Sequence, residues 1–381
     1  MPNVHFEGDV HWWREWTLYI HQYGFSNAYN DPDINYQPGL LYLLRIYAWL
    51  CPTTIVENIV VLKRLVFCFD VGAVFLVAYV LKRYHRSPWW SLLLLLNPGY
   101  LYNTLLWGQV DSMYTFFCFL SLVLLLEARP YAAIAAMAFS IMMKPQAVFM
   151  GPLLLLIYSG WLKEKPVRVL NALLVFGLSW VIICSPFIIN GQFSRLLELT
   201  FGVVDRMPSV SMHAYNIWYL IFPGKDLVWE PDNAIYGAYT LRGWGMLMFT
   251  AALVFTLVPF KKYFKHSFLI PYDQLKQQWP VFLLGAAAVN LVFFYFNTQM
   301  HERYIHAAVL LLGAYAFITG KYMPFVLISV AYFLSLDHLM HHCRFPDFVY
   351  QAILPYNPIF ISLLFLLTLV LVWRQLFRRY P

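Results

Sequence analysis

The sequence predicts an all-α integral membrane protein with about 11–12 transmembrane helices and extracytoplasmic loops that carry short amphipathic helices. Hydrophobic residues make up 61% of the 381 residues, and the mean hydropathy is +0.60. Charged residues make up 12%, roughly half of their share in soluble proteins. A soluble fold could not bury this much apolar surface, which excludes the soluble classes.

Apolar runs long enough to cross, or nearly cross, a hydrocarbon core of about 30 Å follow one another along the chain. Several are short and are expected to lean on their neighbours. The runs lie near 58–81, 88–104, 112–126, 131–144, 146–161, 169–189, 242–260, 279–296, 304–319, 322–336 and 352–373.

Basic clusters between these runs assign the two sides of the membrane. They lie at 82–86, 163–168, 261–265 and 374–379, and alternate threading places all four on one face, which the positive-inside rule makes cytoplasmic. This accounts for the net charge of +7 without a nucleic-acid partner. The chain is expected to form a single domain, 1–381. Its extracytoplasmic segments are 1–57, 105–111, 144–146, 190–241, 297–303 and 337–351.

Residues 38–51 are apolar but amount to only one short crossing. A re-entrant or in-plane helix is favoured, held at the interface by Tyr42, Arg45, Tyr47 and Trp49. If this segment crosses the membrane, every later segment is assigned to the opposite face. The acidic segment before it has no membrane helix ahead of it, so either the N-terminus lies outside or a first helix is missing from this chain.

The cysteines and the absence of an Asn-x-Ser/Thr sequon indicate which cellular membrane contains the protein. Four of the five cysteines lie in or beside apolar runs and are interpreted as small hydrophobes. The missing sequon favours the bacterial cytoplasmic membrane over the endoplasmic reticulum.

The aromatic-rich segment before the first run contains Glu7 and Asp9. A carboxylate beside a bilayer can take the proton of a hydroxyl acceptor and still reach a lipid-borne substrate. The alternative is a solvated loop carboxylate near interfacial tryptophans. In the following segment, Asp31-Pro32-Asp33 is interpreted as a turn, and Lys63 and Asp70 as a structural ion pair within a membrane run.

Two further polar motifs fall at outer turns. Gln109 and Asp111 could bind sugar hydroxyls, although Asp111 could equally cap the following helix. Lys144 lies away from the cytoplasmic clusters, next to Pro145 and Gln146, which favours an anionic partner such as a phosphate.

The later loops carry the remaining candidates. The segment 209–218 contains His213 and Asn216, for which simple loop packing stays open. Met300-His301-Glu302-Arg303-Tyr304 offers convergent donors, and the arginine fork suits a phosphate. A further group of histidines could resemble a zinc site but is more simply interpreted as interfacial. It comprises His338, His341 and His342.

The ordered set of these motifs resembles the GT-C superfamily of polyprenyl-phosphate-sugar-dependent glycosyltransferases. It is similar to bacterial multi-pass mannosyltransferase-like proteins and to the dolichyl-phosphate-glucose glucosyltransferases of N-glycan assembly. The departure is the missing first helix. The motifs that carry the resemblance, in order, are Gly8-Asp9, Tyr36-Gln37-Pro38, Asp70, Asn97-Pro98, 107–111, 144–146, 214–218 and 300–304.

The resemblance implies an inverting transfer of a hexose, most simply mannose, on the extracytoplasmic face. The donor would be a polyprenyl-phosphate sugar and the acceptor a hydroxyl of a glycolipid, glycan or protein, in contact with membrane lipid. Asp9 would be the general base. No cofactor is required, and a divalent metal is not favoured. A lipid-linked sugar flippase and a non-catalytic membrane scaffold are the alternatives. The expected substrate- or donor-binding residues are Glu7, Gln109, Asp111, Lys144, Gln146, Asn216, His301, Glu302 and Arg303.

Overall fold

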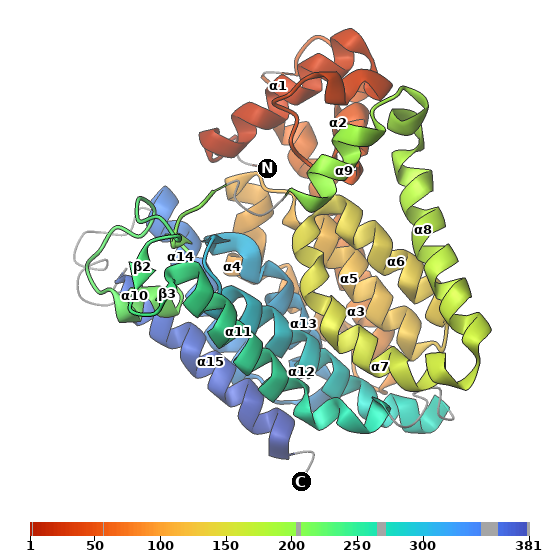
Figure 1. Ribbon diagram of the computed structural model, residues 1–381, viewed down its shortest axis with the longest axis vertical. Helices are drawn as coiled ribbons and strands as arrows, with labels where there is room; N and C mark the ends of the chain where they lie inside the picture. The colour runs from red at the N-terminus through yellow and green to blue at the C-terminus, as the bar shows by residue number, and fades with distance from the viewer. Residues whose placement is uncertain (2, 56, 203–206, 265–271, 344–356, 379–381) are drawn as a thin grey trace. The chain divides into compact units, whose positions relative to one another are not determined.

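The computed structural model describes the chain except for residues 2, 56, 203–206, 265–271, 344–356 and 379–381, and the described part is mostly helical (Figure 1). The predicted helical membrane class is therefore confirmed. Lys265 and Arg379 of the predicted basic clusters lie outside the described residues. The chain divides into two units, which are described separately. The first comprises Met1–Leu76, Leu101–Val148 and Lys165–Arg206, and the second comprises Val77–Tyr100, Phe149–Glu164 and Met207–Pro381.

Seven helices in the described part of the chain are long and apolar enough to cross a membrane. Two further apolar helices are shorter, Asp111–Leu126 and Pro130–Met143. The expected total also counted apolar runs shorter than a full crossing. The seven candidate spans are Ile59–Arg83, Pro145–Glu164, Pro166–Ile189, Leu241–Lys262, Gln277–Phe296, Met323–Met340 and Pro358–Arg378.

The run at 88–104 differs from a continuous helix. Asn97 and Pro98 interrupt it, because a proline disfavours helical geometry in the residue before it. The Asn97 side chain accepts a hydrogen bond from the backbone N–H of Tyr100 at 3.0 Å. This bond stabilises the first turn of the short helix that follows. The run is thus divided into η2 (Pro88–Leu94), α4 (Pro98–Leu101) and a π-helical segment, η3 (Tyr102–Trp107).

The first unit is built from amphipathic and apolar helices whose boundaries follow the prolines. Proline begins α2, α6 and α8, since its fixed φ suits a first helical turn that needs no N–H donor there. The elements that lie wholly or mainly in this unit are α1 (Glu7–Tyr23), η1 (Phe25–Asn30), α2 (Pro38–Leu50), α3 (Ile59–Arg83), η3, α5 (Asp111–Leu126), α6 (Pro130–Met143), η4 (Pro145–Met150), α8 (Pro166–Ile189) and α9 (Phe193–Phe201).

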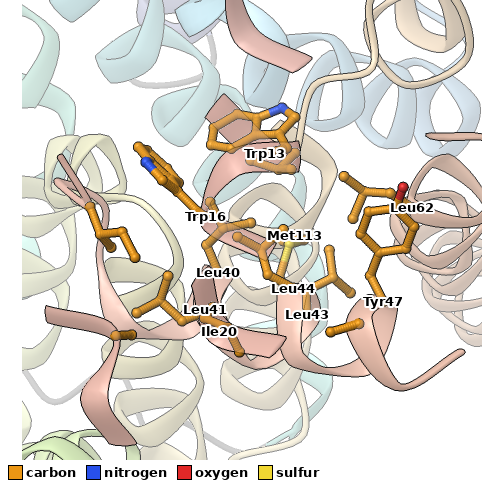
Figure 2. Close-up of a cluster of buried hydrophobic side chains, with 14 of the residues drawn as sticks. Trp13, Trp16, Ile20, Leu40, Leu41, Leu43, Leu44, Tyr47, Leu62 and Met113 are labelled. Atoms are coloured by element: carbon orange, nitrogen blue, oxygen red, sulfur yellow. The ribbon is translucent and has the colours of Figure 1, made fainter. Parts of the chain in front are cut away.

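A cluster of buried side chains from α1 and α2, joined by residues of α3, α5, α6, α8 and α9, forms the core of this unit (Figure 2). Trp13, Trp16 and Ile20 line one face of α1 and are buried with the leucines of α2. Gly39 lets α2 approach the end of α6, because a Cβ there would lie 2.6 Å from the carbonyl oxygen of Met142. The segment expected to be an N-terminal loop is therefore a packed helical pair.

Helix α2 has 13 residues and extends about 20 Å, too short to cross a hydrocarbon core of about 30 Å. This agrees with the re-entrant or in-plane interpretation. Arg45 and Trp49 are exposed as expected, but the interfacial role predicted for Tyr47 is wrong. Tyr47 is fully buried, and its hydroxyl donates to the carbonyl of Ile55, which fastens the helix to the following turn.

In the second unit, α11, α12, α13 and α15 lie side by side (Figure 1). Helix α13 is buried all round between α12 and α14, as expected for a helix that is apolar on every face. The elements are α7 (Gly151–Glu164), β1 (Ser211–Met212), α10 (Ile217–Ile221), β2 (Ile235–Tyr236), β3 (Tyr239–Thr240), α11 (Leu241–Leu257), η5 (Val258–Phe264), α12 (Tyr272–Phe296), β4 (Met300–His301), η6 (Glu302–Ile305), α13 (His306–Thr319), α14 (Met323–Met340) and α15 (Pro358–Arg378), with η2 and most of α4.

Candidate active site

Asp9 lies in the first turn of α1, where a helix N-terminus favours a negative charge. The indole N–H of Trp107 donates to its carboxylate oxygen Oδ2 at 2.9 Å, and Asp9 remains half-buried. The backbone joins the same two segments, because the N–H of Phe6 donates to the carbonyl of Trp107 at 3.0 Å. The structure thus brings the predicted base onto the predicted Trp-Gly-Gln-Val-Asp motif.

Gly108 makes this close approach feasible. Its φ is +86°, a region that glycine enters without strain, and a Cβ would lie 3.0 Å from the Val10 side chain. The Lys63 ammonium donates to the carbonyls of Val4 and Leu105, the latter at 2.8 Å, and so ties the N-terminal segment to the π-helical turn. The predicted ion pair between Lys63 and Asp70 stays a prediction.

Gln109, Asp111 and Lys144 are fully or almost fully buried. Asp111 forms a buried ion pair with Lys144 and accepts a hydrogen bond from Asn103 Nδ2 at 3.3 Å. The alternative in which Asp111 caps α5 is wrong, because Asp111 is the first helical residue and Val110 holds the cap position. Among the described residues, Gln109 Nε2 has no hydrogen-bond partner although it is buried.

Glu7 and Gln146, the other two candidates in this unit, have different surroundings. Glu7 is exposed and accepts from Arg14 at 3.1 Å and pairs with His5 at 2.7 Å, so it organises the surface before α1. Gln146 lies in η4, directly after Pro145 ends α6 as predicted. Its Oε1 is buried and has no hydrogen-bond partner in the described part of the chain.

The second unit contains the His301 motif at a short parallel pairing of β1 with β4. Met212 is opposite His301 in this pairing, and His213 forms an additional bridge with His301. Six described non-glycine residues have a positive φ, and four of them belong to this region: His213, Tyr215, Gln299 and His341. Such conformations cost of order 1–3 kcal/mol each and cluster at functional sites.

Glu302 and Arg303 are buried next to each other. Arg303 Nη1 donates to Glu302 Oε1 at 2.8 Å and lies 3.5 Å from His301 Nδ1. The Arg303 side chain is 9% exposed. A carboxylate therefore already orients the guanidinium that was expected to meet a phosphate.

Asn216 has a structural role in this fold. Its side chain caps α10 by accepting from the N–H of Trp218 at 3.3 Å, and it donates to the carbonyls of Phe294 and Asn297. This agrees with the loop-packing interpretation. Of the histidines considered as a zinc site, His338 is hydrogen-bonded to the Tyr215 hydroxyl, and its ring centroid lies 5.9 Å from that of His341. No group of three or more His, Cys, Asp or Glu in the described residues is placed to hold a metal.

Asp232 is a buried carboxylate that the motif analysis missed. Arg242 donates to both of its oxygens at 2.9 Å, Thr298 Oγ1 donates at 3.0 Å and Gln299 Nε2 at 2.8 Å. It therefore connects the start of α11 to the residues directly before the His301 motif. The sequence signal was an acid ten residues before an arginine at the start of a membrane run.

Asp232 predicts an acid-dependent loss of stability. Burial raises the pKa of its carboxyl, but the hydrogen bonds from Arg242, Gln299 and Thr298 outweigh this and hold the pKa below the ordinary 3.8. A lowered folded-state pKa gives stability that is fully present above the unfolded value and is lost as the pH falls through the folded value. Thermal unfolding should show this loss below pH 3.8, and Asp232→Asn should lower stability at neutral pH and flatten the acid dependence. An unchanged acid profile in the variant would contradict this assignment.

No protein-family model matches this chain, and no curated protein matches its sequence. The resemblance to the GT-C superfamily therefore rests on the residues themselves. In the first unit, Asp9 contacts Trp107 of the 107–111 motif, and Lys144 contacts Asp111. In the second unit, His301, Glu302 and Arg303 lie together.

Proposed function

We propose that the protein is an inverting glycosyltransferase that moves a hexose, most simply mannose, from a polyprenyl-phosphate donor to a hydroxyl acceptor. The observation that carries this proposal is the half-buried Asp9 carboxylate, oriented by the Trp107 indole at 2.9 Å. This hydrogen bond gives the carboxylate a fixed direction, as a positioned general base requires. We place the reaction on the extracytoplasmic face of a bacterial cytoplasmic membrane.

In this scheme Asp9 takes the proton of the acceptor hydroxyl as its oxygen attacks the anomeric carbon. The bond between that carbon and the donor phosphate breaks, and the polyprenyl phosphate leaves with the bonding electrons. Its negative charge needs cationic or N–H donors rather than an acid. One base therefore suffices, unlike the carboxylate pair of glycoside hydrolases.

Two features of the later motif support a role in binding. Non-glycine residues with a positive φ gather around the β1–β4 pairing, and the Arg303 guanidinium is oriented by Glu302. Lys144 fits the donor phosphate less well than expected, because its charge is matched by Asp111. In the proposal, Lys144 positions Asp111 and the neighbouring Gln109.

The direct test is sugar transfer by the purified protein in detergent, with radiolabelled polyprenyl-phosphate mannose or glucose and a panel of glycolipid, glycan and peptide acceptors. We expect a labelled product of inverted anomeric configuration, formed also in the presence of EDTA. The matched control is Glu15→Gln, which removes an exposed carboxylate of the same helix. No product with any donor, from protein that remains folded, would contradict the proposal.

A second candidate, a lipid-linked sugar flippase, is favoured by Asp70 alone. This carboxylate lies near the middle of α3 and is fully buried, as expected of a group on a path through the membrane. Proteoliposomes with a fluorescent lipid-linked sugar separate the two functions. Lipid scrambling that Asp70→Asn abolishes, without sugar transfer, would favour the flippase.

A further inference from the structure

An uncharged hairpin precedes α11 and exposes apolar and aromatic side chains. Residues 234–240, here called the aromatic hairpin, contain β2 and β3 joined through Gly237, whose φ is +66°. Ile235 is 80% exposed, Tyr236 55% and Tyr239 56%. Such an edge is an association hazard in water, so its exposure needs an explanation.

The hairpin continues directly into a candidate membrane span. Thr240 caps α11 by accepting a hydrogen bond from the N–H of Gly243 at 3.1 Å, so there is no linker between the two elements. Apart from Thr250, the exposed residues of α11 are apolar and include Met246, Leu247 and Val254. Lys261 and Lys262 lie at the opposite end of the span. The hairpin therefore adjoins the end of this candidate span that is opposite the lysines.

The exposed aromatic rings are held in place. Trp244 Nε1 donates to the carbonyl of Tyr236 at 2.7 Å, and the rings of Tyr239 and Trp244 meet edge-on at 5.2 Å. The rings of Phe222 and Tyr236 meet in the same way at 5.4 Å. Ordering these side chains on contact with a partner would thus cost little further entropy.

We propose that the aromatic hairpin inserts into the headgroup layer of the bilayer and anchors this end of α11. Tyrosine and tryptophan are enriched at membrane interfaces because their rings are apolar and their tips are polar. The absence of charge in 234–240 and the unbroken path into the apolar surface of α11 favour lipid over a second copy of the chain. The anchor is tied to the His301 motif, since Asp232 and Arg242 flank the hairpin and Asp232 also binds Thr298 and Gln299.

Depth-dependent fluorescence quenching tests this anchor without reference to catalysis. Single cysteines at Ile235, Tyr239, Leu247 and Lys225 would be labelled with an environment-sensitive dye, after exposed Cys68 and half-buried Cys343 are replaced by Ser. The labelled proteins would be placed in phosphatidylcholine nanodiscs containing lipids spin-labelled at the headgroup or in the middle of the acyl chain. Exposed Lys225 is the matched water-facing control, and exposed Leu247 on α11 is the lipid-facing one.

We expect headgroup spin labels to quench the dyes at Ile235→Cys and Tyr239→Cys strongly and the dye at Lys225→Cys weakly. Mid-chain spin labels should quench the dye at Leu247→Cys more than either hairpin dye. Hairpin dyes that respond like the one at Lys225→Cys would overturn the proposal, because the hairpin would then lie in water. If two Tyr239→Cys molecules form a disulfide crosslink and the hairpin dyes are not quenched, the proposal is also overturned. The hairpin would then contact a second copy of the chain.

Discussion

Replacing Asp9 with Asn should lower the turnover number for sugar transfer by about 10²–10⁴-fold, the range that a positioned general base contributes. Asparagine has the same shape, and its carbonyl oxygen can still accept the hydrogen bond from Trp107. The packing of α1 depends on Trp13, Trp16 and Ile20 instead, so the variant should remain folded. The measurement is single-turnover transfer from a polyprenyl-phosphate sugar, with thermal unfolding in detergent as the check on folding.

Two further variants distinguish the loss of the Asp9 carboxylate from the loss of its orientation by Trp107. Trp107→Phe keeps an aromatic ring near Phe6 but removes the donor to Asp9, so we expect a smaller loss, about tenfold, for one hydrogen bond to a charged group. Glu15→Gln should leave transfer unchanged. If Asp9→Asn turns over at a near-normal rate, Asp9 is not the base.

The helices could be predicted from the sequence because an apolar run in a membrane must satisfy its own backbone. The break at Pro145 was predicted, because a proline removes a donor and disfavours helical geometry before it. The break at Pro98 was not, since 88–104 was predicted as one run. The amphipathic character of α2 was also predictable from its length and from Arg45 and Trp49, which are exposed. The burial of Tyr47 was not, because it depends on which side of α2 packs against the rest of the unit.

The candidate residues could be chosen from the sequence, but the contacts between them could not be predicted. Asp9 and two residues of the 107–111 motif, Gln109 and Asp111, were predicted as site residues, but Trp107 was not. Asp9 and Trp107 are separated by 98 positions, and local pattern carries no information about their contact. Asp111 before an apolar run has the local pattern of a helix cap, and only the distant Lys144 shows that its carboxylate is used otherwise. Asp232 escaped because its partners lie at 242, 298 and 299 and it belongs to no motif.

The pair formed by Lys144 and Asp111 should have the largest effect on stability. Both side chains are almost completely buried, 2% and 0% exposed. Removing one partner leaves the other charge in a medium of low dielectric constant, which costs about 3–5 kcal/mol. Lys144→Met and Asp111→Asn should each lower the free energy of unfolding by that amount, measured by reversible denaturant titration in mixed micelles.

The double variant decides whether this cost arises from the isolated charge or from lost packing. Lys144→Met with Asp111→Asn removes both charges, and the new amide can still accept the hydrogen bond from Asn103. Replacing both members of a buried pair is often close to neutral, so the double variant should be more stable than either single one. The exposed pair of Arg195 and Glu198 is the matched control, and Glu198→Gln there should cost about 0–1 kcal/mol. If the two single losses simply add in the double variant, the charges do not interact and the pair does not hold the end of α6 against α5. Lys144 would then regain its place as a candidate ligand for the donor phosphate.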